Sequence, residues 1–419
     1  MRVLVIGSGA REHALCASLR ADPAVQGLVC APGNAGTDTV AESRPVEVSD
    51  PAAIADLSAA EAVDLVVIGP EVPLVAGAAD AVRARGIACF GPSASAARLE
   101  GSKDFAKEVM AAAGVPTARS RTCRDAAEIA SALDRFGPPY VVKDDGLAGG
   151  KGVVVTADRD DAERHARSIV GAGRRVVVEE FLAGPEVSLF AVTDGVTILP
   201  MLPAQDYKRI GDGDTGPNTG GMGAYCPLPW LPPGFVDDVV GLVLRPIVAE
   251  MARRGTPYTG LLYAGLVLTP DGTKVIEFNA RFGDPETQVV LALLESPLCG
   301  LLYAAATGNL ATHAPLLWSG SSAVTVVVAA AGYPGTPRTG DEVRGGFGDG
   351  ILHAGTRRGA DGQVLVSGGR VLSVTATGAD LAAAQAAAYL RASTVDFPGM
   401  QFRTDIAAAA VRGVIRVAG

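Results

Sequence analysis

Short apolar runs alternate with helical patterns over the first ninety residues of the chain. The apolar runs, rich in valine and isoleucine, lie at residues 3–6, 27–30, 64–68 and 87–90. Helical patterns separate them at residues 10–20, 51–59 and 74–85. Uniformly apolar strands that alternate with helices are typical of a parallel sheet with helices on both faces. The pattern therefore predicts a doubly wound α/β domain over residues 1–101, with its ligand-binding loops at the carboxyl ends of the strands.

A second unit follows the helical pattern at residues 94–113. Its apolar runs and helical patterns predict a small α+β lid over about residues 117–187, with strands at 119–122, 140–143, 152–156 and 175–181 and helices at 126–136 and 160–170. Residues 102–315 are expected to form one domain that includes this lid. Residues 316–419 are expected to form a third, β-rich α+β domain with strands at 323–331, 364–366 and 371–377 and a helix at 380–391.

Between the lid and the third unit, residues 205–225 read as a long polar loop rich in glycine, hydroxyl and amide side chains. Loops of this length are usually functional or disordered. Apolar strands flank the loop on both sides, which favours a functional loop that wraps an anionic substrate. A helix at 235–253, a strand at 261–268 and a second strand at 275–279 follow it.

The strand at 275–279 carries the strongest chemical signal. Alternation places Ile276 and Phe278 on one face, and Glu277 and Asn279 on the other, with Arg281 in register. Carboxylate and amide oxygens suit Mg²⁺, which takes only one or two protein ligands and leaves the others to phosphates and water. A solvated sheet edge is the alternative. The turn at 283–285 and an acid in the first turn of the next helix favour a site.

The first glycine-rich loop, residues 7–12, reads G-x-G-x-x-E, with Glu12 where a dinucleotide fingerprint has its third glycine. The second strand also lacks the terminal acid of that fingerprint, which argues against NAD. The glycines favour a phosphate on the N-terminus of the first helix. A tight turn without a ligand is the other interpretation.

A second glycine-rich loop at residues 143–152 joins two strands and has a lysine near each end. It is not a P-loop, because Gly152 follows Lys151 and a strand follows the loop. A glycine flap over a triphosphate fits this arrangement, with exposed hairpin lysines as the alternative. Asp144, next to Lys143, is expected either to repel ATP or to point into solvent.

The net charge of −9 and the scattered Lys and Arg residues argue against nucleic acid as a partner. No apolar run reaches membrane-spanning length and none resembles a signal-peptide core. The six cysteines have no paired spacing, so reduced thiols in a cytoplasmic enzyme are expected, without zinc.

Several long motifs in order support one family assignment. They are VLVIGSGAREHAL at 3–15, APGNAGT at 31–37, DTGPNTGGMGAY at 214–225 and, most specifically, RFGDPETQ at 281–288. With these motifs the chain resembles, over nearly its whole length, the glycinamide ribonucleotide synthetases, or phosphoribosylamine–glycine ligases, of the ATP-grasp superfamily. The resemblance implies ATP-dependent ligation of glycine to 5-phosphoribosylamine through glycyl phosphate, in purine synthesis.

The resemblance also implies roles for individual residues. Glu277 and Asn279 would hold Mg²⁺ or Mn²⁺ on the phosphates of ATP. Arg281 would pair with the glycine carboxylate or the transferring phosphoryl group, and Asp212 with the glycine ammonium. The other implied nucleotide contacts are Lys103, Lys143, Gly149, Gly150, Lys151, Gly152, Glu179, Leu182 and Glu186. The implied phosphoribosylamine contacts are Gly9, Glu12, Asn34, Glu71, Asn218, Thr219 and Asp284.

The expected partners are therefore small molecules, with no nucleic acid and no membrane, and the expected state is a monomer or weak homodimer in the cytoplasm. One departure from the wider superfamily is the strand at 261–268, which has Gly265 where many relatives carry a metal-binding acid. The alternatives are another purine-pathway ATP-grasp carboxylase or formyl-transferring ligase, an NAD-dependent oxidoreductase, and a nucleotide-binding regulator without turnover.

Overall fold

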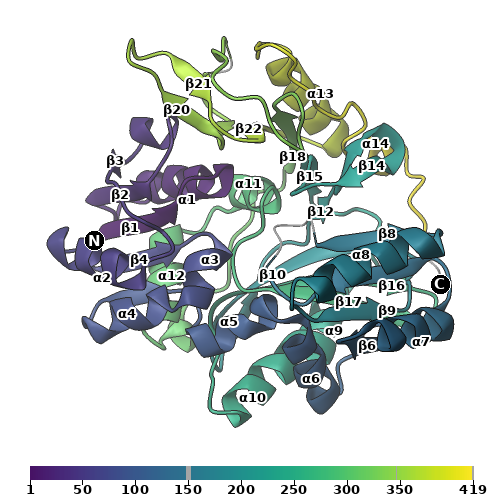
Figure 1. Cartoon of the computed structure of the whole chain (residues 1–419). Coiled ribbons are helices and arrows are strands. Elements are labelled where there is room, and N and C mark those ends of the chain that lie inside the picture. The colour runs from purple at the N-terminus through teal and green to yellow at the C-terminus, as the bar shows by residue number, and fades with distance from the viewer. Residues whose placement is uncertain (148–151, 346, 418–419) are drawn as a thin grey trace.

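The computed structural model describes residues 1–147, 152–345 and 347–417. Its N-terminal part is the predicted parallel sheet, with strand order β3-β2-β1-β4-β5 (Figure 1). The strands are β1 (Arg2–Gly7), β2 (Gly27–Pro32), β3 (Glu42–Ser43), β4 (Leu65–Ile68) and β5 (Ala88–Phe90). The helices are α1 (Ala10–Ala21), α2 (Pro51–Ala60), α3 (Glu71–Ala76) and α4 (Ala78–Ala84), with a 3₁₀ turn η1 (Thr37–Thr39).

Two helices that the pattern predicts as continuous are each broken by one residue. Gly77 has φ of +98°, in the left-handed region that favours glycine, and separates α3 from α4. Ser102 separates α5 (Ala94–Gly101) from α6 (Lys103–Ala113). Its hydroxyl accepts the N–H of Phe105 as an N-cap. The break starts a new helix at Lys103, so that its side chain leaves the first turn of α6.

The predicted lid is a four-stranded antiparallel sheet, β6-β9-β7-β8, with two helices on it (Figure 1). Its core joins both helices to the inner face of the sheet. The elements are β6 (Ser120–Cys123), α7 (Ala126–Phe136), β7 (Tyr140–Asp144), β8 (Val153–Thr156), α8 (Arg159–Gly171) and β9 (Val176–Glu179).

The antiparallel sheet β11-β10-β16-β17 is the central sheet of the molecule. Its strands are β10 (Glu186–Asp194), β11 (Ile198–Pro200), β16 (Thr259–Thr269) and β17 (Gly272–Asn279). The helical elements around it are α9 (Phe235–Val239), a π-helical segment η3 (Val240–Leu244), α10 (Arg245–Arg253), α11 (Glu286–Leu293), α12 (Leu298–Ala306) and η4 (Leu310–Thr312).

The expected long loop at residues 205–225 is mostly paired backbone. It contains β12 (Gln205–Asp206), β13 (Arg209–Gly211), η2 (Asp212–Asp214) and β14 (Thr215–Asn218), and β15 (Gly223–Cys226) follows. The strands β13 and β14 form a hairpin, and β15 pairs with β18 (Ser322–Ala329). The expectation of a loop without secondary structure was therefore wrong: β12 pairs with β15 and β13 with β14 inside the stretch, and β18 adds a distant partner for β15.

The C-terminal sheet has the order β12-β15-β18-β22-β19 and thus includes two strands from the middle of the chain. The remaining elements are β19 (Ile351–His353), β20 (Thr356–Arg358), β21 (Val364–Val366), β22 (Arg370–Gly378), α13 (Leu381–Ala392) and α14 (Ala408–Val411). The last helix, α14, is a single short turn in the alanine-rich terminal segment. The division of the chain into three domains at 101 and 315 stays a prediction.

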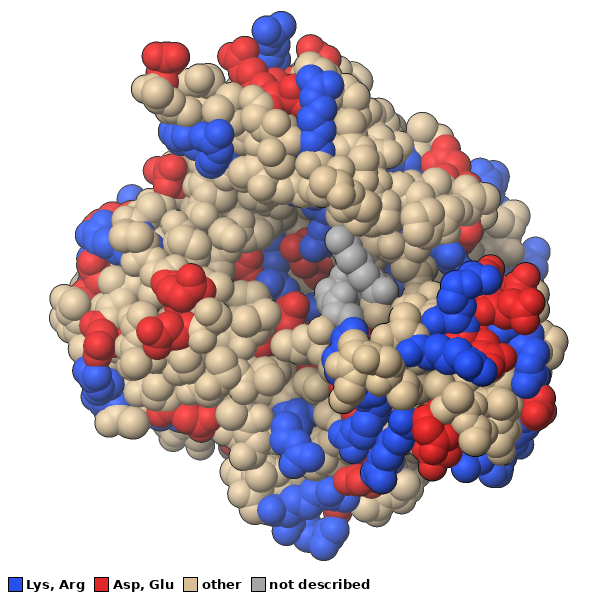
Figure 2. Space-filling view, in the orientation of Figure 1, with Lys and Arg blue, Asp and Glu red and all other residues tan. Residues whose placement is uncertain are grey.

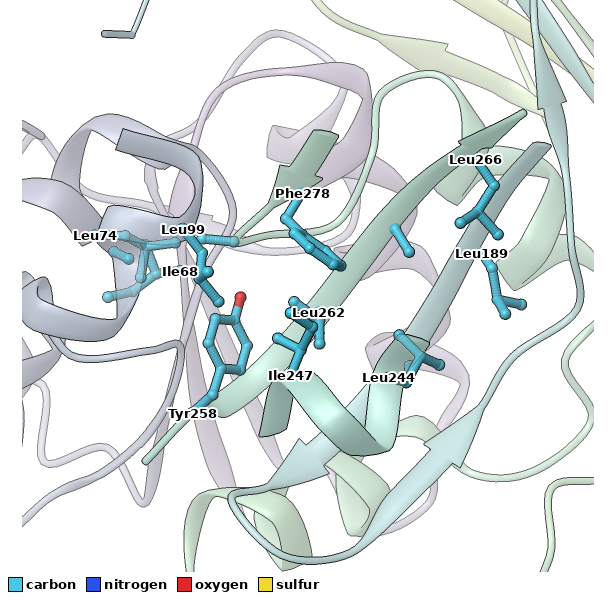
Figure 3. Packing of buried hydrophobic residues seen from close by; sticks show 14 of the residues in the cluster. Ile68, Leu74, Leu99, Leu189, Leu244, Ile247, Tyr258, Leu262, Leu266 and Phe278 are labelled. Carbon is cyan, nitrogen blue, oxygen red and sulfur yellow. The ribbon is translucent and has the colours of Figure 1, made fainter. Parts of the chain in front are cut away.

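One apolar cluster runs from the N-terminal helices into the central sheet. Figure 3 shows Phe278 of β17 and Leu262 of β16 between Leu74 and Leu99 on one side and Leu189 and Leu266 on the other. These residues are at most 2% exposed. Because the interior is close-packed, the cluster holds β17 rigidly against the N-terminal part. No helix within the described ranges is long and apolar enough to span a membrane.

A second contact joins the N-terminal part to the C-terminal sheet through two buried histidines. Nδ1 of His13 accepts the backbone N–H of His353 at 2.9 Å, and the two rings lie 5.8 Å apart. Burial, together with the neighbouring ring, lowers the pKa of His13 to about 4. Burial and Arg358 lower the pKa of His353 to about 4, against the opposing effect of Asp38. Both rings are therefore neutral in the folded protein at pH 7.

We expect acid to weaken this contact between about pH 6.5 and pH 4. The unfolded histidines bind protons in that window and the folded ones do not, so stability is present above pH 6.5 and falls as the pH drops. The free energy of unfolding, measured in urea, falls between pH 7.5 and pH 5, and His13→Gln should make this fall smaller by about 1–2 kcal/mol. His313→Gln, at a ring whose Nδ1 lies 2.7 Å from the adjacent carbonyl of Ala314, is the control. An unchanged pH dependence in His13→Gln would contradict the expectation.

Candidate active site

A cavity of about 780 Å³ lies where the lid, the central sheet, the N-terminal loops and the C-terminal sheet meet. Figure 2 shows a hollow at the middle of this face, with acidic and basic side chains inside it. Its cationic lining residues include Arg11, Lys103, Lys107, Lys143, Lys208, Arg281 and Arg370. Its acidic lining residues include Glu71, Glu100, Glu179, Glu186, Asp206, Glu277, Asp284 and Glu286. A cavity lined by both signs of charge suits a ligand set that contains phosphates and cations.

The strand β17 forms part of the cavity wall through Glu277 and Asn279. A β-bulge lies beside them, because Gly265 pairs with Glu277 whereas Leu266 pairs with Val275. Ile276 is the extra residue and is only partly buried, whereas Val275 and Phe278 are buried, so the expected alternation that puts Ile276 on one face with Phe278 does not hold. The bulge leaves the adjacent Glu277 and Asn279 in the cavity wall.

Electrostatics keep Glu277 ionised. Burial opposes its ionisation, but the ammonium groups of Lys208 and Lys143 outweigh burial and lower the pKa of Glu277. An ionised carboxylate two residues from an amide oxygen is a suitable donor set for a hard divalent cation. The strand β16 adds no acid, since Gly265 faces Glu277 there and a Cβ at that glycine would lie 3.3 Å from Cγ of Glu277. Among the described residues, no group of three or more His, Cys, Asp and Glu side chains is arranged to hold a metal.

The predicted nucleotide contacts gather on the lid side of the cavity. Lys103, Lys143, Gly152, Glu179, Leu182 and Glu186 all line it. Nζ of Lys103 donates to the carbonyl of Gly146 at 3.1 Å, and Glu186 pairs with Lys208. Gly149, Gly150 and Lys151 lie outside the described residues, so the predicted flap contacts stay predictions.

Asp144 takes neither of its two expected orientations. It is buried, with 3% of its surface exposed, and pairs with Arg174. Successive side chains of a strand point to opposite faces, so Asp144 points away from the cavity that Lys143 lines. It therefore neither faces a phosphate nor points into solvent.

Arg281 sits between two carboxylates of the N-terminal half. Its Nε lies 3.1 Å from Oε2 of Glu71, and its Nη2 lies 3.2 Å from Oε1 of Glu100. Burial raises the pKa of Glu100, although Arg281 opposes the shift. The guanidinium thus links β17 to α3 and α5 and also lines the cavity.

The first glycine loop does not present an open anion site. A carboxylate oxygen of Glu12 accepts the N–H of Gly9 at 2.6 Å, where a phosphate was expected. A Cβ at Gly69 would lie 2.0 Å from the other carboxylate oxygen, so the neighbouring loop closes over it. Asn34 donates to the carbonyls of Ser8 and His353 and accepts from Gly36 and Thr37. These interactions are structural, and the cavity lining does not include Gly9, Glu12 or Asn34.

The other predicted substrate residues do line the cavity. Glu71, Asn218, Thr219 and Asp284 are all in its wall. Asp284 accepts from Gln288 at 2.8 Å and lies 3.1 Å from Nη2 of Arg370, which approaches from β22. Burial opposes the ionisation of Asp284, but Arg370 and Arg11 outweigh it and lower its pKa.

Asp212 lies elsewhere. It sits in η2, where its carboxylate accepts the backbone N–H of Thr404 at 2.8 Å and also the hydroxyl of Thr404. The cavity lining does not include it, so the structure does not support Asp212 as the partner of an ammonium group. The hairpin β13–β14 turns η2 toward the C-terminal segment instead.

Several cavity residues were missed by sequence reasoning. They are Arg11, Glu100, Lys107, Asp206, Lys208 and Arg370. Burial raises the pKa of Asp206 to about 7, against Lys208 and together with Glu286. The alternation of Asp206 and Lys208 two residues apart was a usable signal in the polar stretch, whereas Arg370 gives none, because its place depends on the pairing of β22 with β18.

Comparisons with known proteins agree with this geometry. Models of the phosphoribosylglycinamide synthetase family match residues 1–100 (N domain), 101–287 (ATP-grasp domain) and 323–409 (C domain). A phosphoribosylamine–glycine ligase from Streptomyces coelicolor is 64% identical over 98% of this chain and 99% of its own length. One from Mycobacterium tuberculosis is 59% identical over the full length of both chains.

Solved structures show the same fold. The crystal structure of a phosphoribosylamine–glycine ligase from Thermotoga maritima has a TM-score of 0.85 and 33% identity, over 97% of this chain and 100% of that one. A biotin carboxylase domain from Hydrogenobacter thermophilus, solved with MgADP, has a TM-score of 0.73 and 16% identity, over 96% of this chain and 91% of that one. The second likeness concerns the fold alone.

The lid sheet and the central antiparallel sheet enclose a cavity, and Glu277 and Asn279 of β17 lie in its wall. Together with the match to the ATP-grasp domain model, this arrangement defines an ATP-grasp ligase. More particularly, the chain belongs to the phosphoribosylglycinamide synthetase family.

Proposed function

We propose that the protein joins glycine to 5-phosphoribosylamine at the expense of ATP, giving glycinamide ribonucleotide, ADP and phosphate. The observation that carries the proposal is the mixed-charge cavity between the lid and β17, in a chain whose relatives of the same length are named for this reaction. This is a step of purine synthesis. The RFGDPETQ string at 281–288 argues against the related carboxylases and formyl-transferring ligases.

The chemistry follows from a poor leaving group. A carboxylate does not react with an amine because oxide cannot depart, so the γ-phosphoryl group of ATP is first transferred to a glycine oxygen and ADP leaves. The amine nitrogen of phosphoribosylamine then attacks the acyl carbon, the C–O bond to phosphate breaks, and the nitrogen loses a proton. These steps need charge neutralisation and alignment rather than a protein nucleophile.

The residues of the cavity divide between these tasks. Glu277 and Asn279 would hold a divalent cation, Mg²⁺ or Mn²⁺, which neutralises phosphate charge when bound. Lys103 and Lys143 would bind phosphate oxygens, and the segment from Glu179 to Glu186 would bind adenosine. Gly149, Gly150, Lys151 and Gly152 would cover the phosphates and exclude water from the acyl phosphate.

The phosphoribosyl group would lie near Glu71, Asn218, Thr219 and Asp284, where Arg11 and Arg370 supply the positive charge that a phosphate needs. Arg281 would keep its double ion pair and present its remaining edge to the glycine carboxylate or the transferred phosphoryl group. We also propose that the protein acts in the cytoplasm as a monomer or weak homodimer.

The proposal predicts ADP release that requires both glycine and the amine. The assay contains ATP, Mg²⁺, glycine, ribose 5-phosphate and ammonia, the last two forming phosphoribosylamine in place. ADP is measured by a coupled reaction, and glycine or ammonia is omitted in the controls. ADP release that is unchanged without glycine would overturn the proposed function. Replacing Mg²⁺ with Mn²⁺ in the same assay shows which cation is preferred.

A further inference from the structure

Two lysines, Lys143 buried and Lys107 partly buried, share one carboxylate at the lid end of the cavity. Nζ of Lys107 lies 3.0 Å from Oε1 of Glu179, and Nζ of Lys143 lies 2.9 Å from Oε2 of the same residue. The three side chains are 13%, 5% and 3% exposed for Lys107, Lys143 and Glu179. The cluster therefore holds two positive charges and one negative charge with little exposed surface, in the wall of the cavity.

The two lysines differ in how firmly they are fixed. An ammonium group has three N–H donors. Those of Lys107 reach Glu179, the hydroxyl of Thr117 at 2.9 Å and the carbonyl of Ala118 at 3.0 Å. All three acceptors belong to the lid and its connection to α6, so Lys107 is fixed in place.

Lys143 is placed differently. Besides Glu179, its ammonium donates to the carbonyl of Ile276, the bulged residue of β17, at 3.2 Å. Lys143 also lies near enough to Glu277 to help lower the pKa of that carboxylate. It therefore stands between the lid and the strand that is proposed to hold the cation, where the phosphates of a nucleotide would pass.

The position of Lys107 on its helix separates it from Lys103. The two residues are four apart in α6, on the same side of the helix. Lys103 contacts the carbonyl of Gly146, whereas Lys107 contacts Glu179 one turn further on. Lys107 thus pairs with the carboxylate oxygen that Lys143 does not use, and its other two N–H groups are taken by protein acceptors.

A carboxylate held by a single lysine would oppose nucleotide binding. If Lys143 were the only partner of Glu179, its movement toward a phosphate oxygen would leave a buried carboxylate unpaired, which is strongly unfavourable. With Lys107 already on Oε1, Glu179 keeps a cationic partner when Lys143 moves. The second positive charge of the cluster is then available to the polyphosphate.

We propose that Lys107 is a positioning residue for the nucleoside triphosphate: it holds Glu179 so that Lys143 can turn to a phosphate oxygen. Lys107 acts through Glu179 and makes no contact with the reacting atoms. This inference rests on the proposed function for its substrate, and it adds a residue that the motif-based assignment does not include.

The test is a double-mutant cycle on the full chain, with Lys107→Met, Glu179→Gln and the double variant. The dissociation constant for a non-hydrolysable ATP analogue with Mg²⁺ is measured by calorimetry, and KM and kcat by ADP release. Lys107→Met should raise the dissociation constant and the KM for ATP by about tenfold or more. It should leave kcat and the KM for glycine within about threefold, because the reacting groups are untouched.

The double variant distinguishes positioning from general damage. A glutamine amide needs no cationic partner, so Glu179→Gln in the Lys107→Met background should recover at least about threefold of the lost ATP affinity. Additive losses in the cycle would overturn the proposal, as would ATP affinity within twofold of the unmodified protein in a folded Lys107→Met variant.

Two further variants keep the test decisive. Lys107→Arg retains the charge on Glu179 and should keep ATP affinity within about threefold. If Lys107→Met does not fold, Lys107→Gln replaces it with the same expectation. Analogue binding is measured without turnover, so a protein that binds nucleotide in this pattern but releases no ADP would contradict the proposed function and not this inference.

Discussion

Replacing Glu277 with glutamine is expected to lower kcat/KM for ATP by about 10²–10³-fold. Glutamine has the shape of glutamate but no charge, so it is a weaker ligand for a divalent cation. It also leaves Lys208 and Lys143 without the carboxylate that they now stabilise. The loss should therefore combine weaker cation binding with poorer alignment of the phosphates.

The effect is measured by ADP release as a function of both ATP and free Mg²⁺, and we expect the variant to need more Mg²⁺ for half-maximal rate. The melting temperature should change little, because Glu277 faces the cavity and not the core. Glu295→Gln, at an exposed position after α11, is the matched control and should retain full activity. Activity of Glu277→Gln within threefold of the unmodified protein would remove this residue from the metal site.

Replacing Arg281 with methionine is expected to lower the free energy of unfolding by about 3–5 kcal/mol. The change leaves the carboxylates of Glu71 and Glu100 in the protein interior without their cation. A buried ion pair contributes little net stability, but removing one partner leaves an uncompensated charge, which costs much more. The contact of β17 with α3 and α5 should weaken, and ADP release should fall with it.

The pH dependence of this variant has a definite sign. Burial already raises the pKa of Glu100, and the loss of Arg281 removes the main opposing effect. A folded pKa above the unfolded value gives stability that is present at low pH and lost as the pH rises. Arg281→Met should therefore be less destabilised at pH 5 than at pH 8.

Urea unfolding at the two pH values measures both the loss and its direction. Arg124→Met, an exposed arginine on the lid, is the control and should change stability by no more than about 0.5 kcal/mol. A loss below about 1 kcal/mol in Arg281→Met would show that the two carboxylates find other partners.

The parts of the fold that the sequence predicted are those in which the pattern is local. The parallel strands β1, β2, β4 and β5 are short apolar runs between helices, and each lid element follows its own periodicity. Glu277 and Asn279 were located in the same way, since alternation along one strand is enough to place both on one face.

The errors arose where a distant part of the chain decides the outcome. Pairing of β15 with β18 joins part of the apparent loop to the C-terminal sheet, and the bulge opposite Gly265 breaks the alternation that would place Ile276 on one face with Phe278. Both depend on partner strands that no local pattern reveals. Glu12 likewise reads as a loop acid, and only the folded loops show that its carboxylate occupies the helix N-terminus.

The alternation of Asp206 with Lys208 marks one acid of the polar stretch, but the exclusion of Asp212 from the site depends on strand pairing. Asp206 and Asp212 lie six residues apart in this stretch, and either reads as a ligand. The pairing of β12 with β15 places Asp206 in the cavity wall, whereas the hairpin that follows carries Asp212 to Thr404. Lys107 was missed because its role depends on Glu179, which reaches it from β9.

The C-terminal sheet has a consequence for how the protein is made on the ribosome. Strands β12 and β15 pair with each other and emerge long before β18, the partner on the other edge of β15. At about 5–20 residues per second, the nascent chain must hold Gly223–Cys226 with an open edge for on the order of 5–20 s. Exposed strand edges promote aggregation, so chaperone demand during synthesis should peak in this interval. A fragment that stops before Ser322 should remain insoluble even though its central sheet is complete.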